Sequence, residues 1–286
     1  MMAVATLAAS AGFVQAASSL FGRRASLSSV GVPALVLAVG AGCALAVSPW
    51  WMAPGAHLLP DPWWLAPLTG LLLLLGNLCA MTAMAHGAVS LVVPVLSGKV
   101  VLVALGTAVI GGTVPGSTWL GALLVCAGIA VLHGGSRQLG GGSSLPLAVA
   151  AAVAYAVFDL LFAAHSARLG MAGLLPAATC WAVIGSLPLL AVARWPHEGR
   201  LALGLCSGLH GMQTAALVGA IVIAGTATTP NILYGCRGIW SVLLVLVLGA
   251  RLGLDEGGSG RLAWRLAGAV LIALAIACTL LGDRPC

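Results

Sequence analysis

Residues 91–105 read LVVPVLSGKVVLVAL, an apolar run with a lysine, Lys99, at its middle and a proline, Pro94, five residues earlier. The run extends from about Ala88 to about Ile110, roughly the 20 residues that a helix needs to cross ~30 Å of hydrocarbon. A charge at the centre of such a helix costs roughly 2.5–3.5 kcal/mol on insertion scales. Lys99 is therefore expected to face a partner, a cavity or a substrate.

A second stretch has the same plan. Residues 229–248 read TPNILYGCRGIWSVLLVLVL, with Pro230 early and Arg237 near the middle. Proline removes a backbone donor, and freed backbone groups are tolerated at membrane depth only where they line a cavity or meet other protein. We therefore expect Pro94 and Pro230 to kink their helices beside a cavity.

The composition excludes a water-soluble protein. Of the 286 residues, 61% are hydrophobic and only 6% are charged, and the mean hydropathy is +1.12. Soluble domains carry about 25% charged residues. Helices satisfy their own backbone hydrogen bonds in lipid, and the short alternating segments of a membrane β-barrel are absent from the sequence. The fold class predicted is an all-α polytopic membrane protein.

Two further classes of partner are disfavoured. The net charge of +6 does not indicate nucleic-acid binding, because ten of the twelve basic residues lie in predicted loops or at the chain end. The eight cysteines are scattered, without CxxC spacing or a Cys/His cluster, so neither a disulfide framework nor a metal site is expected. Arg23 and Arg24 follow the first apolar run instead of preceding it, which favours a retained helix over a signal peptide.

Ten transmembrane helices are predicted, and they fall into two groups of five. Residues 1–136 form a first five-helix repeat, 137–144 a Gly/Ser-rich linker and 145–286 a second five-helix repeat. The predicted spans are about 2–21, 30–49, 63–84, 88–110, 117–133, 145–165, 172–193, 201–224, 228–249 and 263–281.

Polar residues and prolines recur between the two groups at similar offsets. Because each group has an odd number of spans, the second must enter the membrane from the opposite face. Such an inverted repeat is characteristic of secondary transporters, whose substrate site lies near the midplane. The recurring pairs, 136 to 144 positions apart, are Pro94 with Pro230, Asn77 with Gln213, Lys99 with Arg237, and Gln15 with Asp159.

The loops predict an orientation. Eight arginines lie in loops after predicted spans 1, 5, 7 and 9, and two lie on the opposite side. By the excess of basic residues in cytoplasmic loops, both termini would lie outside the cytoplasm. The expected location is the cell (inner) membrane.

Residues 88–132 read AVSLVVPVLSGKVVLVALGTAVIGGTVPGSTWLGALLVCAGIAVL. This stretch resembles the drug/metabolite transporter superfamily, specifically EamA-type proteins, in its proline-containing fourth helix, short turn and fifth helix of the form W-x-G-A-x-L-x-x-x-G. Residues 230–280 repeat the pattern more loosely. The resemblance implies a carrier of small organic solutes that works by alternating access. It also implies a central cavity lined by the first, third, fourth, sixth, eighth and ninth helices.

One departure from that superfamily concerns charge. The related small multidrug proteins use a first-helix glutamate to bind protons and cationic drugs, whereas the first helix here offers only Gln15. Cationic-drug efflux by that device is therefore not expected.

The candidate substrate-binding residues are the polar residues predicted at mid-membrane. Asp159 is the only acidic residue within a span, so two cations against one anion leave one positive charge for a substrate carboxylate or phosphate. Alternatively, Asp159 pairs with one cation as a structural tie. The set is Gln15, Asn77, Lys99, Tyr155, Asp159, His210, Gln213, Tyr234 and Arg237; among them His210 could relay protons or only pack, and the three amides could be interhelical hydrogen-bond partners.

The function expected is secondary transport of an anionic or zwitterionic metabolite, such as an amino acid, organic acid or sugar phosphate. A proton or ion would couple transport. A membrane scaffold or sensor is the alternative, and an intramembrane enzyme is disfavoured because HExxH, GxSxG and paired carboxylates are absent from the sequence. No catalytic residue, cofactor or metal is expected. Small-residue stripes, Gly121/Gly128 and Gly268/Ala275, would join the two halves or two protomers of a homodimer.

Overall fold

The computed structural model describes residues 2–134, 144–195, 197–254 and 262–282, and within these ranges the regular elements are all helices. Residues 137–143 of the predicted linker lie outside the described ranges. The helices are α1 (Met2–Leu27), α2 (Val32–Val47), η1 (Ser48–Met52), α3 (Leu65–His86), α4 (Val89–Ser97), α5 (Lys99–Val109), α6 (Gly116–Gly134), α7 (Ser144–Ser186), η2 (Leu187–Val192), α8 (Arg200–Ala224), α9 (Thr228–Tyr234), α10 (Arg237–Leu248), η3 (Ala250–Leu252) and α11 (Leu262–Gly282).

Among the described residues, seven helical segments are long and apolar enough to cross a membrane, and two shorter apolar helices lie at Gly116–Gly128 and Leu266–Cys278. The predicted all-helical, multi-pass class is confirmed at this level, while the count of ten spans is not established. One of the seven segments contains α7, which bends at Gly170 (φ 62°, ψ −173°). Glycine reaches this backbone conformation at little cost. The predicted spans 145–165 and 172–193 correspond to the two limbs on either side of the bend.

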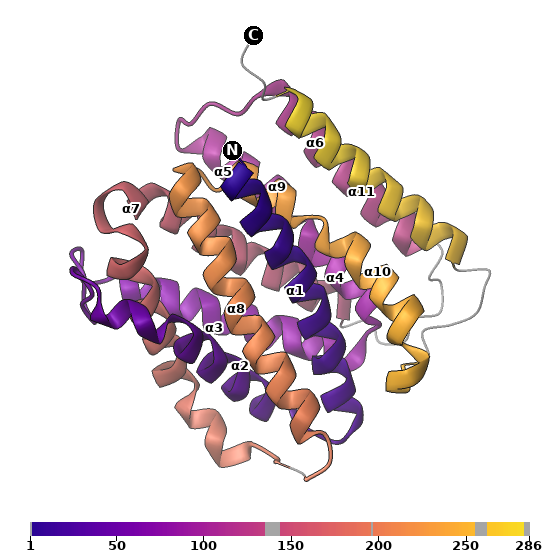
Figure 1. Cartoon of the computed structure of the whole chain (residues 1–286), viewed down its shortest axis with the longest axis horizontal. Helices are drawn as coiled ribbons and strands as arrows, with labels where there is room; N and C mark the ends of the chain where they lie inside the picture. The colour runs from indigo at the N-terminus through magenta and orange to yellow at the C-terminus, as the bar shows by residue number, and fades with distance from the viewer. Residues whose placement is uncertain (1, 135–143, 196, 255–261, 283–286) are drawn as a thin grey trace.

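The helices from the two halves of the chain interleave. In Figure 1, α1 and α8 run side by side across the bundle, and α6 and α11 lie together at one edge. The Ser18 hydroxyl on α1 donates to the Cys206 carbonyl on α8 over 2.8 Å. A Cβ on Gly128 of α6 would lie 2.9 Å from the Gly268 carbonyl of α11, so this small-residue face joins the two halves.

Two helix contacts are so close that only glycine fits. A Cβ on Gly42 of α2 would collide with the backbone of Ser207 on α8, and one on Gly211 would collide with the Gly42 carbonyl. The Ser207 hydroxyl also donates to a carbonyl of α2. Between α3 and the second limb of α7, a Cβ on Gly70 would lie 2.6 Å from Trp181 Cβ. Each of these contacts joins the first half of the chain to the second.

Two membrane segments are interrupted, and a basic residue follows each interruption. Gly98 separates α4 from α5, which begins at Lys99, and Gly235 and Cys236 separate α9 from α10, which begins at Arg237. Pro94 lies inside α4, ahead of the first interruption.

The predicted kink at Pro230 is not found at that residue. Pro230 is the third residue of α9, in the first helical turn, where the missing N–H would have had no partner within the helix. The interruption of this segment falls at Gly235 and Cys236 instead.

Candidate functional site

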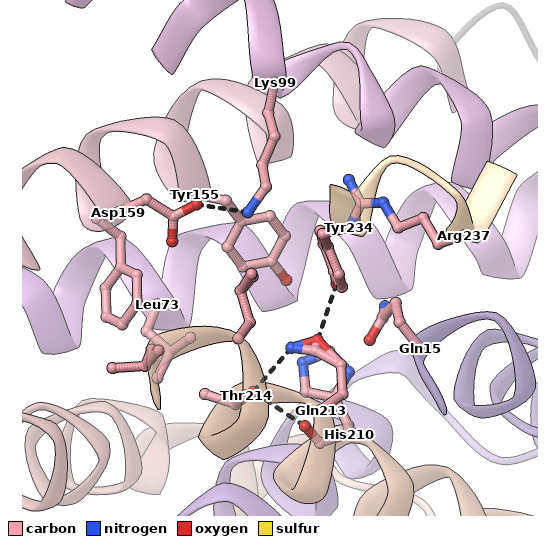
Figure 2. A pocket seen from close by; sticks show the side chains of 13 residues that line it. Gln15, Leu73, Lys99, Tyr155, Asp159, His210, Gln213, Thr214, Tyr234 and Arg237 are labelled. Carbon is pink, nitrogen blue, oxygen red and sulfur yellow. Dashed lines mark hydrogen bonds and ion pairs between the residues drawn. The ribbon is translucent and has the colours of Figure 1, made fainter. Parts of the chain in front are cut away.

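A cavity lies between α1, α3, α5, the first limb of α7, α8 and the α9–α10 junction, the segments expected from the resemblance to surround a central site (Figure 2). The space between its lining atoms, open solvent included, is about 390 Å³. The lining residues are Gln15, Leu73, Lys99, Tyr155, Phe158, Asp159, His210, Gln213, Thr214, Leu217, Val218, Tyr234 and Arg237.

Lys99 and Asp159 form a buried ion pair. The ammonium nitrogen of Lys99 lies 2.6 Å from Asp159 Oδ2, and the two side chains are 4% and 3% exposed. Lys99 is the first residue of α5 and Asp159 lies on α7, so the pair joins the two halves of the chain. Removing two charges from water is costly, and a close partner offsets that cost. The pair therefore has no net charge to offer a ligand.

Arg237 is held differently. Its Nε donates to the Ser97 hydroxyl over 3.1 Å, and that hydroxyl donates in turn to the Val93 carbonyl. The residue is 2% exposed, and its Nη2 has no hydrogen-bond partner within the described residues. The two ion pairs found among the described residues involve Lys99 and Arg168, not Arg237. Arg237 is thus a buried cation without a counter-charge in the part of the chain described.

The aromatic ring of Tyr234 separates the two cations. Lys99 Nζ lies 5.0 Å and Arg237 Cζ 4.3 Å from its centroid, within the range of cation–π attraction. Figure 2 shows the ring between the two side chains. The Tyr234 hydroxyl donates to Gln213 Oε1 over 2.9 Å, which fixes the ring. The two cations therefore flank this ring.

Tyr155 has a similar anchor. Its hydroxyl donates to Asn77 Oδ1 over 2.7 Å, and its ring packs where a Cβ on Gly76 would lie 2.5 Å away. Asn77 was predicted to bind substrate, but it is not among the lining residues. Its amide oxygen instead accepts the interhelical hydrogen bond from Tyr155 that was the alternative considered for the amides.

Two neutral residues on the cavity wall have buried polar atoms without a partner among the described residues, Gln15 Oε1 and His210 Nδ1. Gln15 Nε2 makes one hydrogen bond, to Ser19 Oγ at 3.4 Å. Buried polar atoms in native proteins are nearly always paired with protein or water, so each exception calls for an explanation. Three such atoms on one cavity, counting Arg237 Nη2, indicate a place for water or a polar ligand.

Several residues of the site carry no polar signal that would reveal them in the sequence. Leu73, Phe158, Leu217 and Val218 line the cavity, yet an apolar residue on a transmembrane helix looks the same whether it faces lipid or a ligand.

Ser97, which holds Arg237, could have been found from its position two residues before Lys99. A further lining residue, Thr214, adjoins Gln213 and accepts a hydrogen bond from Gln213 Nε2 over 3.2 Å.

No group of three or more metal-binding side chains is found within the described ranges. No family model matches the sequence, and no curated protein matches it. A solved structure titled "Crystal structure of protein" is similar, with a TM-score of 0.65 and 20% sequence identity over 96% of this chain and 98% of that chain. At this identity the likeness concerns the fold alone, and it extends over nearly the whole of both chains.

Proposed function

We propose that this protein is a secondary transporter that moves a small anionic or zwitterionic metabolite by alternating access. The observation that carries the proposal is the Arg237 guanidinium, which is buried on the cavity wall with Nη2 unpartnered among the described residues. An uncompensated buried charge is strongly destabilising. A carboxylate or phosphate of the substrate would supply the missing partner through charge-assisted hydrogen bonds.

The neutral groups beside Arg237 narrow the substrate class. Gln15 Oε1 can accept a hydrogen bond from a substrate ammonium or hydroxyl group, and His210 Nδ1 can donate or accept according to its tautomer. Amino acids, organic acids and small sugar phosphates meet these requirements.

The architecture supports transport. We propose ten spans arranged as two inverted repeats, counting the two limbs of α7 separately and adding α6 and α11 to the apolar segments. Helix contacts recur between the halves: α1 packs on α8, and α3 packs on α7. Interrupted segments at equivalent places, each followed by a basic residue, are typical of transporter substrate sites. The same features support membership of the EamA-type transporters and a location in the cell (inner) membrane.

Counterflow in proteoliposomes tests the proposal. Purified protein is reconstituted, and labelled amino acids, organic acids and sugar phosphates are tested for saturable uptake. Arg237→Gln is expected to reduce uptake of the substrate about 100-fold, because two charge-assisted hydrogen bonds would be lost. The matched control is Arg168→Gln, which removes an arginine whose side chain is 61% exposed and pairs with Asp61 outside the cavity.

Each other outcome overturns the proposal. Uptake unaffected by Arg237→Gln would remove Arg237 from the substrate site. Absence of both flux and ligand-induced thermal stabilisation over the whole panel would favour a scaffold or sensor. Conversion of a tested compound into a product would favour an intramembrane enzyme.

A further inference from the structure

A second cavity lies at the ends of helices instead of at their middle, and the space between its lining atoms, open solvent included, is about 690 Å³. It is formed where α1 ends, α8 begins and η3 follows α10. The lining residues are Phe21, Arg24, Ser28, His197, Gly199, Arg200, Leu201, Ala202, Leu205 and Leu252.

The rim of this cavity is basic. Arg24, Arg200 and His197 all line it, and the lining set contains no acidic residue; Glu198 is exposed and is not part of it. Arg24 Nη1 lies 3.3 Å from where a Cβ on Gly253 would be, so the arginine of α1 extends to the segment that follows α10. Both arginines are exposed and thus available to a ligand.

The wall of the cavity is apolar and continues onto the outside of the protein. Leu201 and Leu205, one helical turn apart on α8, are 79% and 39% exposed. On a helix that spans a membrane, exposed leucines face acyl chains. Phe21 and Leu252 add apolar surface from α1 and η3. The cavity therefore combines cations at a helix end with an apolar surface that continues along α8.

We propose that this cavity binds the phosphate group of an anionic phospholipid, with an acyl chain lying along Leu201 and Leu205. Guanidinium groups match phosphate oxygens in geometry as well as charge. Basic pockets between transmembrane helices are suited to anionic headgroups. The first amides of α8 add to the attraction, because its N-cap, Gly199, provides no side chain to cap them.

The lipid would contact the helices that hold the Arg237 side of the central cavity. Gln15 lies on α1, His210 lies on α8, and Arg237 begins α10, which η3 follows. Occupancy of the lipid site is thus expected to stabilise the arrangement of these helices. Binding itself does not depend on transport, so it can be measured whether or not a substrate is known.

Native mass spectrometry and thermal unfolding in detergent test the proposal with dioleoylphosphatidylglycerol, dioleoylphosphatidylcholine and inorganic phosphate as probes. Phosphatidylglycerol is expected to remain bound and to raise the unfolding temperature more than phosphatidylcholine does. Arg24→Gln and Arg200→Gln are each expected to weaken phosphatidylglycerol binding about fivefold. Arg194→Gln is the matched control, since Arg194 is an exposed arginine of the η2–α8 connection that does not line the cavity.

The results separate the possible ligands. Equal losses in Arg24→Gln, Arg200→Gln and Arg194→Gln would show general charge attraction and overturn the site. Stabilisation by inorganic phosphate, without any preference for phosphatidylglycerol, would indicate a small-anion site and overturn the lipid proposal. The unfolding temperature of each variant without added lipid, compared with that of the unaltered protein, would reveal a loss of binding caused only by misfolding.

Discussion

The two sides of the central cavity hold their cations in opposite ways. Lys99 and Arg237 each begin a helix after an interruption. A carboxylate neutralises Lys99, whereas Arg237 contacts the Ser97 hydroxyl and a tyrosine ring. Asp159 lies on the first limb of α7, and the residue that the predicted repeat pairs with it is Gln15 on α1. One side of the cavity thus has a cation paired with a carboxylate, and the other has a cation without one among the described residues. The two sides differ by a single acidic side chain.

The comparison assigns different roles to the two cations. The pair between Lys99 and Asp159 ties α5 to α7 and contributes to the fold. Arg237 leaves a donor free at the cavity, and in the proposed function it provides the charge for binding. If this assignment is right, changes on the Lys99 side should affect stability first, and changes on the Arg237 side should affect transport first.

The largest effect on stability is expected from Asp159→Asn. The substitution leaves Lys99 buried without a counter-charge, and breaking a buried pair in this way costs about 3 kcal/mol of unfolding free energy, the lower end of the usual range because the amide oxygen still accepts a hydrogen bond. Denaturant titration of the purified protein in mixed micelles measures the loss.

The matched control for that experiment removes both charges. Lys99→Met combined with Asp159→Leu is expected to recover most of the stability lost in Asp159→Asn, because a well-packed apolar pair can replace a buried ion pair. A double variant no more stable than Asp159→Asn would contradict the structural role of the pair.

The next largest effect is expected from Gln15→Glu, which would place a carboxylate on the Arg237 side of the cavity. Gly12, one turn earlier on α1, packs so that its Cβ would lie 3.2 Å from the Arg237 backbone nitrogen, and Gln15 lines the same cavity as Arg237. A glutamate there would pair with Arg237 and compete with the substrate anion. Uptake in proteoliposomes is expected to fall at least about tenfold while the unfolding free energy does not decrease.

Gln15→Ala separates charge from the loss of the amide. It should reduce uptake less than Gln15→Glu does, because it leaves the positive charge of Arg237 open. If both variants lost uptake equally, Gln15 would matter as a hydrogen-bond partner, and the charge comparison between the two sides would fail.

The smallest effects are expected from the two tyrosine hydroxyls. Tyr155→Phe and Tyr234→Phe each leave an amide oxygen without its donor, Asn77 Oδ1 or Gln213 Oε1, at a cost of about 1 kcal/mol in stability. Only Tyr234 lies between the cations. Tyr234→Phe is therefore expected to weaken uptake about threefold, and Tyr155→Phe less than twofold, in the same proteoliposome measurement. The reverse order would place the substrate on the Lys99 side.

The sequence predicted the polar residues of the candidate site. A charge or amide within an apolar span is conspicuous because its burial is costly, and Lys99, Asp159, Gln15 and Arg237 were all found in this way and do line one cavity. The sequence could not show which cation pairs with Asp159, because Asp159 lies on a different helix from both Lys99 and Arg237. The structure shows Asp159 paired with Lys99.

Other features could not be predicted, because they involve apolar side chains or depend on backbone geometry. Phe158 and Leu73 face the cavity, but their apolar side chains suit lipid equally well. Asn77 is polar and buried, but it does not line the cavity, and its amide oxygen accepts a hydrogen bond from Tyr155. The bend of α7 depends on one glycine with positive φ, and the interruption after α9 falls at Gly235 and Cys236 rather than at Pro230.

The glycine contacts restrict which parts of the protein can move. Gly42 and Gly211 bring the backbones of α2 and α8 together with no room to slide, and Gly70 does the same for α3 and the second limb of α7. Both contacts join the first half of the sequence to the second. In the proposed transport cycle, each moving unit would therefore combine helices of both halves, and the boundary between moving units would not coincide with the boundary between the proposed repeats.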